Sequence, residues 1–211
     1  MKDYVKPLPG AERRFLTGQP IALRAAEGEG KPRKFSGYAA LYNSRSANLG
    51  SPERPFIEII APGAFDGVLK QDVRALFNHN PDHVLGRSRE SGGTVRLFSD
   101  ERGLGFEIDV PDTQLGRDLA TSVERGDIDQ NSFAFRIAKD GDKWVEEGGV
   151  ITRTIKRVAE LFDVSLVTYP AYPDTSVAVR SLDEFLRQQT PPAPSPVTTS
   201  PRETGLRIFT R

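Results

Sequence analysis

Short runs of apolar residues, separated by glycine, proline and polar turns, recur along the middle of the chain. Their length is that of strands rather than of long helices, and several of them alternate between apolar and polar side chains. From this pattern we predict strands over residues 35–42, 56–60, 73–77, 94–98, 104–110, 132–137, 151–155 and 161–168.

One stretch between these runs has a helical period. Apolar side chains recur at helical spacing over residues 115–123, after Asp112 and Thr113, and Gly126 follows the last of them. Either Asp112 or Thr113 can cap a helix by accepting a hydrogen bond from a free backbone N–H, and a glycine is typical of a helix end. Further helices are predicted over residues 64–69 and 177–186.

Residues 140–149 are typical of a hairpin region, with Gly148 and Gly149 at its turn. Strands and short helices therefore follow one another in mixed order rather than in strict alternation. This order favours an α+β domain built on a mostly antiparallel sheet or barrel.

The ends of the chain differ in composition from this middle part. Residues 1–33 are rich in charge, glycine and proline, and we predict a flexible N-terminal segment with at most an early strand over residues 20–26. Residues 34–189 form the predicted domain. Residues 190–211 begin with five prolines spaced through alanine, serine and threonine, so we predict an extended linker and a short basic tail.

Composition narrows the classes of function. The chain has 211 residues, with 29 lysines plus arginines and 29 aspartates plus glutamates, so no overall field attracts it to nucleic acid or an anionic membrane. No apolar stretch approaches the roughly 20 residues of a membrane span, and the first 18 residues lack the apolar region of a signal peptide. We therefore expect the protein to stay in the cytoplasm of the cell that makes it. The absence of cysteine excludes disulfides, thiolate metal sites and a cysteine nucleophile.

His79 and His83 are the two histidines of the chain and hence its natural general bases at neutral pH. His79 comes just after an apolar run that ends at Phe77, which places its imidazole at the end of a buried strand. A zinc pair with His83 is disfavoured, because Pro81 lies between them and opposes a helix. A nuclease of the His-Asn-His type is disfavoured too, since the chain lacks the basic surface that phosphates require.

A serine and two acids complete the candidates for catalysis. Ser132 follows a polar turn and opens an apolar strand, and as a nucleophile it would need a base within hydrogen-bonding reach. Glu160 and Asp163 stand at the start of the most apolar strand, where orienting a histidine is one way to satisfy a buried carboxylate. On a regular strand these two acids point to opposite faces, so at most one of them can reach His79. The alternative local interpretation is that Ser132 satisfies a backbone group at the start of a strand. In the same interpretation, Glu160 and Asp163 are ordinary solvated acids at a strand edge.

Taken together, these segments resemble the prohead protease family of tailed phages over roughly residues 34–182. Their order and spacing carry the resemblance more than any one of them alone. They are FSGYAALYN at 35–43 with IIAPGAF at 59–65, ALFNHN at 75–80 with VLGR at 84–87, DIDQNSFAF at 127–135, and LFDVSLVTYPAY at 161–172.

The resemblance implies a fold related to the herpesvirus assemblins, a mostly antiparallel β-barrel surrounded by short helices. The family's histidine matches His79 and its serine matches Ser132. Assemblins use a second histidine as the third catalytic group, but this chain has none after His83. A carboxylate must then serve, and Asp163, where the family usually has glutamate, and Glu160 both stay open.

The same resemblance implies an activity, a substrate and a place of action. It predicts a serine endopeptidase without metal or cofactor that cuts the scaffolding region of the major capsid protein, and itself, inside the assembling prohead in the host cytoplasm. A homodimer follows by analogy with the assemblins. The oxyanion hole is expected in the turn at residues 170–174, and the C-terminal tail is either a docking segment or a piece removed by the enzyme.

Three other classes remain as alternatives. A non-catalytic scaffolding protein of the same fold is opposed by the presence of both His79 and Ser132. A metal-dependent hydrolase would use His79, Asp82 and His83, and a chelator would reveal it. A bare interaction module for capsid assembly would bind capsid protein without cutting it.

Overall fold

The computed structural model describes residues 8–16, 20–25, 28, 31–169 and 176–189. Within these ranges the chain is mostly β, with two α-helices and one short 3-10 helix. The strands are β1 (Glu12–Leu16), β2 (Ala22–Arg24), β3 (Lys34–Leu41), β4 (Phe56–Ile60), β5 (Val73–Phe77), β6 (Asn80–Ser88), β7 (Val95–Ser99), β8 (Gly103–Asp109), β9 (Gln130–Ile137), β10 (Asp142–Glu147), β11 (Val150–Ile155) and β12 (Val158–Val167). The helices are η1 (Asp66–Val68), α1 (Gln114–Glu124) and α2 (Ser176–Gln189).

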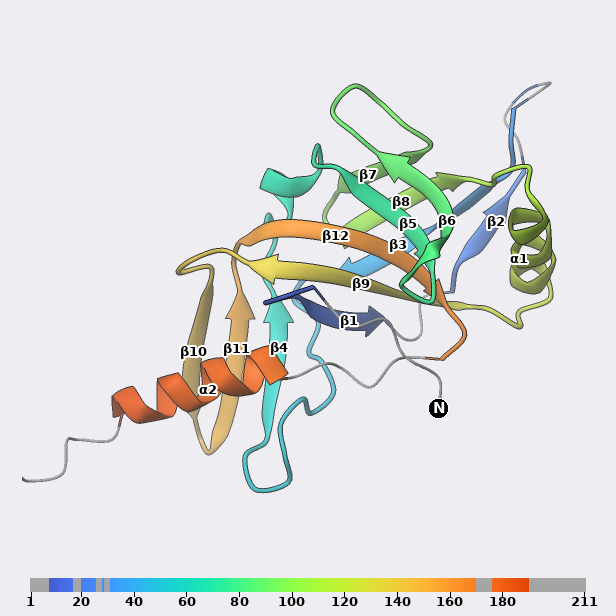
Figure 1. The fold of residues 1–211 in the computed structure, drawn as a ribbon. Helices are drawn as coiled ribbons and strands as arrows, with labels where there is room; N and C mark the ends of the chain where they lie inside the picture. Colours follow the sequence, from blue (N-terminus) through green and yellow to red (C-terminus); the bar gives the residue numbers. More distant parts are fainter. Residues whose placement is uncertain (1–7, 17–19, 26–27, 29–30, 170–175, 190–211) are drawn as a thin grey trace, which may run out of the picture.

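The described strands form three sheets (Figure 1). The largest has the order β1-β9-β12-β5-β6, and the others have the orders β10-β11-β4 and β2-β3-β8-β7. Neighbouring strands run antiparallel except for the pairs β4–β11 and β5–β12, which are parallel. The strand-rich class is thus confirmed, whereas the closed barrel that the family resemblance implied is not shown, because the strands divide among separate sheets.

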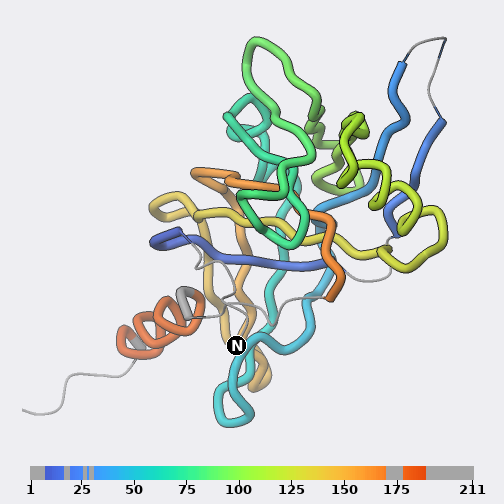
Figure 2. The backbone as a smooth tube through the Cα atoms, turned by 45° about the vertical axis from the view of Figure 1, so that its right-hand side comes forward, coloured from blue at the N-terminus to red at the C-terminus, as the bar shows by residue number. Residues whose placement is uncertain are grey.

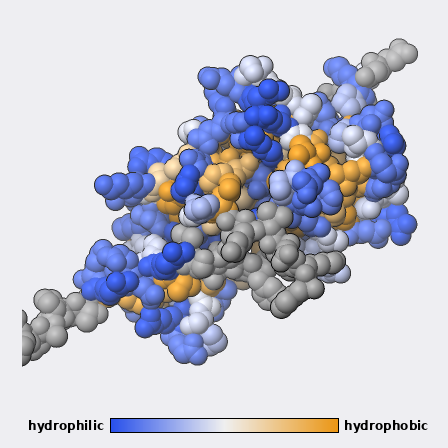
Figure 3. Space-filling model, in the orientation of Figure 1, coloured by the Kyte–Doolittle hydropathy of each residue, from blue (hydrophilic) through white to orange (hydrophobic). Residues whose placement is uncertain are grey.

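Strands β9 and β12 run side by side through the centre of the molecule (Figure 2). Apolar side chains from their inner face pack with those of β3 and β8 into the main core. Phe133 and Phe135 of β9 are 2% and 0% exposed, and Phe35 and Phe106 of the four-stranded sheet are 0% and 1% exposed. On the face in Figure 3, hydrophobic residues gather near the middle and hydrophilic residues occupy the margins.

Local signals set several element ends as predicted. The side chain of Thr113 accepts a hydrogen bond from the N–H of Gly116 at 3.1 Å and so caps α1. Gly126, with φ of +79°, follows the end of that helix. Gly148 and Gly149, with φ of +58° and +78°, form the turn between β10 and β11, where two positive φ values match the twist of a hairpin.

The second helix packs on the three-stranded sheet (Figure 1). Ala178 and Leu182 of α2 join Phe56 of β4 in a small apolar cluster, separate from the main core. Trp144 of β10 packs against this cluster, and its indole N–H donates to Ser181 Oγ at 3.0 Å. The helix thus covers a sheet face that would otherwise expose its apolar residues.

The N-terminal part is more structured than its composition indicates. Residues 12–16, which the sequence placed in a flexible segment, form β1 and pair along their whole length with β9. The segment has a polar appearance because it contains Glu12, Arg13 and Arg14, but Glu12 and Arg14 are buried through pairing with opposite charges. Strand β6 was also not predicted, since its first half is polar and exposed.

Some predictions fall on residues beyond the described ranges. The proline-rich linker and basic tail at 190–211 lie there, as does the turn at 170–174 that was expected to supply the oxyanion hole. Among the helices that are described, none has the length and apolar composition needed to cross a bilayer.

Candidate active site

The five-stranded sheet brings together three of the four predicted site residues. Ser132 lies on β9, Asp163 lies on the neighbouring strand β12, and His79 lies at the turn that joins β5 to β6. Although 84 residues separate His79 from Asp163 in the sequence, β12 and β5 are adjacent strands of the sheet.

The imidazole of His79 bridges the other two side chains. Its Nε2 lies 2.7 Å from Ser132 Oγ, and its Nδ1 lies 2.7 Å from Asp163 Oδ1. All three residues are buried, with exposures of 4% for His79, 1% for Ser132 and 7% for Asp163. Because a carboxylate only accepts hydrogen bonds, Nδ1 carries the hydrogen in this arrangement and a neutral ring leaves Nε2 free to accept from the serine.

A tight turn fixes the position of His79. Phe77 pairs with Asn80 across the β5–β6 hairpin, so Asn78 and His79 are the two turn residues, with φ of +55° and +54°. Two positive φ values are typical of a type I′ turn, and asparagine and histidine adopt them more readily than most residues. Asn78 Oδ1 accepts from the backbone N–H of Thr168 at 2.9 Å, which ties the turn to the end of β12.

Strand pairing places the acid and the serine on one face of the sheet. Ser165 stands opposite Ser132 and Asp163 stands opposite Ala134, and the pairing between these positions is regular. Because side chains two residues apart on a strand point to the same face, Asp163 and Ser132 share a face, and His79 contacts both. Register shifts between Val158 and Glu160 and between Leu161 and Asp163 set this alignment of β12 with β9.

Glu160, the other acid predicted as a candidate, does not reach the histidine. Its carboxylate pairs with the guanidinium of Arg136, and both side chains are 42% exposed. The sequence had left both acids open, and the geometry places only Asp163 beside His79.

His83 lies outside this group as well. It is exposed, and its ring stacks on Phe77 at 6.2 Å between centroids. Both ring nitrogens of His79 are engaged by Ser132 and Asp163, so neither is directed at a metal ion shared with His83. In the part of the chain that the structure describes, no three histidine or acidic side chains are grouped as metal ligands.

Two further contacts at the site were not found from the sequence. Ser165 Oγ donates to Asp163 Oδ1 at 2.6 Å, and the backbone carbonyl of Arg14 lies 2.9 Å from Ser132 Oγ as a second acceptor for its single hydrogen. The period of two along a strand would have indicated Ser165, which stands two residues after Asp163. No comparable signal indicated Arg14, because its strand was not recognised.

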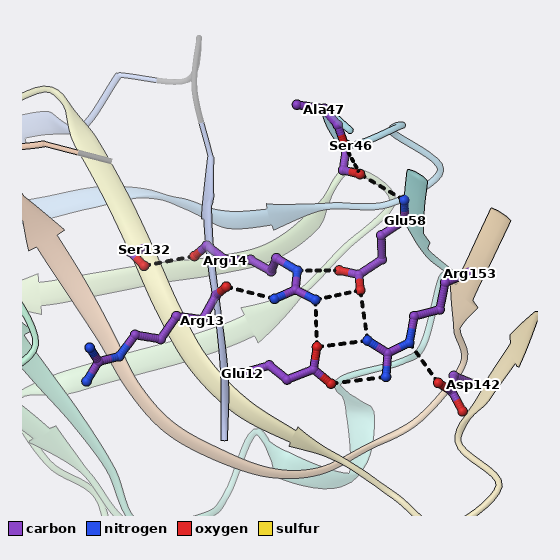
Figure 4. A network of polar contacts seen from close by, with 9 residues as sticks. All are labelled: Glu12, Arg13, Arg14, Ser46, Ala47, Glu58, Ser132, Asp142 and Arg153. Atoms are coloured by element: carbon purple, nitrogen blue, oxygen red, sulfur yellow. Dashed lines mark hydrogen bonds and ion pairs between the residues drawn. The ribbon is translucent and has the colours of Figure 1, made fainter. Parts of the chain in front are cut away.

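A buried network of charges holds the strand that carries Arg14 (Figure 4). The guanidinium of Arg14 donates to both oxygens of Glu58 at 2.8 Å and to Glu12 at 2.6 Å. Arg153 of β11 donates to Glu12 at 2.8 and 3.0 Å, to Glu58 at 3.2 Å and to Asp142 at 2.7 Å. Two cations and three carboxylates therefore tie β1 to the three-stranded sheet.

Burial disfavours the charge on both arginines of this network, but the neighbouring carboxylates outweigh it. Desolvation alone lowers the pKa of Arg153, whereas Glu12 and Glu58 raise it, and the net direction is upward. The pKa of Arg14 is raised by the same balance between burial and the charges of Glu58 and Glu12. Both guanidiniums thus stay charged, and removing one would leave buried carboxylates without a partner.

We therefore expect Arg153→Met to destabilise the fold strongly. Methionine keeps an unbranched apolar side chain but leaves Glu12 and Glu58 short of positive charge, which costs about 3–5 kcal/mol when one partner of a buried pair is removed. Urea unfolding should show this loss in the free energy of unfolding. The control is Arg117→Met, which removes an exposed pair with Asp112 and should cost less than about 1 kcal/mol. Equal effects of the two substitutions would contradict the assigned role of the network.

The chain resembles known proteins in sequence and in structure. A family model described as caudovirus prohead serine protease matches residues 19–188. The comparison with curated proteins found no match. Among solved structures, the chain is similar to the bacteriophage T4 capsid assembly protease, gp21, with 10% sequence identity and a TM-score of 0.42 over 76% of this chain and 99% of that one.

Proposed function

The chain belongs to the caudovirus prohead serine protease family, and from this premise we propose that it is a serine endopeptidase with Ser132 as nucleophile and His79 as general base. The observation that carries the proposal is the imidazole of His79, which is bonded to Ser132 on one nitrogen and to Asp163 on the other. A serine hydroxyl is a weak nucleophile until a base within hydrogen-bonding reach removes its proton, and this arrangement supplies one.

The reaction follows from the donors and acceptors in place. His79 Nε2 takes the proton of Ser132 as Oγ attacks the carbonyl carbon of a peptide bond, and then gives that proton to the leaving amine. Asp163 holds the Nδ1 hydrogen and stabilises the imidazolium that forms between these steps. Because the carbonyl of Arg14 competes for the same hydrogen, the hydroxyl of Ser132 must turn towards Nε2 before attack. Water then releases the acyl group from Ser132, with His79 as base again.

The substrate class comes from the family. We propose that the chain cuts the scaffolding region of the major capsid protein, and itself, within the assembling prohead in the host cytoplasm. The protease would work without a cofactor, and a homodimer is part of the proposal by analogy with the assemblins. The competing proposal is a scaffolding protein of the same family that binds capsid protein without cutting it.

Co-expression with the capsid protein of the same phage tests this function. Mass spectrometry of the capsid protein should reveal truncation at one defined site, with a matching new N-terminus. The purified chain, treated with a fluorophosphonate that reacts with activated serines, should carry the label on Ser132 and lose its activity. If the capsid protein stays intact yet co-purifies with this chain, the scaffolding proposal replaces the protease.

Removal of metal ions should leave cleavage unchanged. The proposed mechanism needs no Lewis acid, since the base and nucleophile are both side chains. Pre-incubation with EDTA should therefore alter the rate by less than about twofold, a free-energy change below about 0.5 kcal/mol. A loss of activity that zinc restores would instead favour a metal-dependent hydrolase that uses His79, Asp82 and His83.

A further inference from the structure

A second serine lies on the opposite side of the histidine from the proposed nucleophile. Ser165 stands two residues after Asp163 on β12, so both side chains point to the same face of the sheet. Ser165 is 1% exposed, and its Oγ donates to Asp163 Oδ1 at 2.6 Å. The same Oγ lies 3.3 Å from His79 Nδ1. This hydroxyl therefore contacts the acid and the base at once.

The single hydrogen on the Ser165 hydroxyl determines which of the contacting groups donates a hydrogen bond and which accepts one. A serine hydroxyl has one hydrogen, and Asp163 takes it, so Ser165 Oγ presents a lone pair to His79 Nδ1. The Nδ1 hydrogen then has two acceptors, Asp163 Oδ1 at 2.7 Å and Ser165 Oγ at 3.3 Å. Both acceptors favour the tautomer that carries its hydrogen on Nδ1. That tautomer leaves Nε2 without a hydrogen, as the proposed proton transfer from Ser132 requires.

We propose that Ser165 is a positioning residue that orients the carboxylate of Asp163 and, through it, fixes the reactive tautomer of His79. The inference rests on the proposed protease function and adds a fourth member to its site. Ser165 acts through Asp163 and does not touch the substrate. It is not a second nucleophile, because its hydrogen is bonded to the carboxylate and Nδ1 itself carries a hydrogen.

Kinetics on a peptide that spans the mapped cleavage site test this role. Ser165→Ala should lower kcat about 10- to 100-fold with KM within about twofold, the range expected for loss of one hydrogen bond to a charged group. Ser165→Thr, which keeps the hydroxyl and suits a strand, should recover kcat to within about fivefold of the wild type. Ser36→Ala removes another buried serine, on β3, and should match the wild type.

A spectroscopic readout separates positioning from mere packing. The Nδ1 proton of His79, held by a carboxylate, should give a low-field proton resonance in the wild type, and Ser165→Ala should shift or broaden it while Ser36→Ala does not. Unchanged kcat and an unchanged resonance in Ser165→Ala would overturn the inference. So would a fall in kcat matched by lower thermal stability with the resonance intact.

The resonance also distinguishes the two levels of the proposal. If the wild type cuts no substrate, the protease function fails, but a resonance that depends on Ser165 would still support its control of His79. If the wild type is active and the resonance ignores Ser165, the function stands and the role of Ser165 is rejected.

Discussion

Replacing Ser132 by alanine, or His79 by alanine, should abolish cleavage of the capsid protein. The two side chains act as one unit, because the serine is activated only through the hydrogen bond between its Oγ and His79 Nε2. Losing either member should therefore cost about the same, roughly 10⁵- to 10⁶-fold in kcat, or about 7–8 kcal/mol of transition-state stabilisation. The double variant should be no worse than either single one.

The matched control for this prediction is the other histidine. His83 is exposed and bonds neither Ser132 nor Asp163 in the described site, so His83→Ala should keep activity within about twofold. The assay is the rate of appearance of truncated capsid protein, with circular dichroism to verify that each variant is folded. A Ser132→Ala protein that cleaves like the wild type would eliminate Ser132 as the nucleophile.

Replacing Asp163 by asparagine should produce the second largest loss, about 10⁴-fold in kcat or roughly 5 kcal/mol. The substitution preserves size but removes the negative charge that stabilises the imidazolium of His79. It also allows the amide NH₂ to donate to Nδ1, which would fix the tautomer that cannot accept the hydrogen of Ser132. The measurement is kcat and KM on a peptide that spans the mapped cleavage site, with KM expected to change little.

Glu160→Gln provides the comparison for the acid. Its carboxylate pairs with Arg136 on a partly exposed edge, so the substitution should leave kcat within about threefold. A large loss in Glu160→Gln together with a small one in Asp163→Asn would reverse the proposed assignment of the third catalytic group.

Local sequence signals determined much of the secondary structure. The cap of α1, the helix end at Gly126 and the turn at Gly148 and Gly149 each depend on the properties of one or two residues. The helix end and the turn were predicted, and the cap was narrowed to Asp112 or Thr113, of which the structure has Thr113. The same signals were insufficient for β1. Its charged residues indicate solvent exposure when read along the chain. Their burial becomes favourable when partners more than 40 residues away, Glu58 and Arg153, join the pair of Glu12 and Arg14.

Some of the candidate catalytic residues could likewise be chosen from the sequence, and others could not. The sequence singled out His79 because a chain with two histidines and no cysteine offers few bases. It singled out Ser132 because this serine opens an apolar strand and, like His79, stands in a segment that resembles one family. It could not choose between Glu160 and Asp163. A regular strand would place the two acids on opposite faces, but the register shifts in β12 put both on one face, with Glu160 opposite Arg136 and Asp163 opposite Ala134. Distance from His79 therefore decides between them, and that distance follows from strand pairing, which is set by the whole sheet.

What the sequence determined by itself is therefore the strand-rich class, the family and two members of the proposed triad, since each follows from local composition or from the order of short segments. The tertiary structure alone decided which acid meets His79, that Ser165 stands beside that acid, and that an N-terminal strand is fixed by buried charges next to Ser132. These features depend on register and on pairing between distant residues. Their energy comes from contacts that exist only once the sheets are assembled.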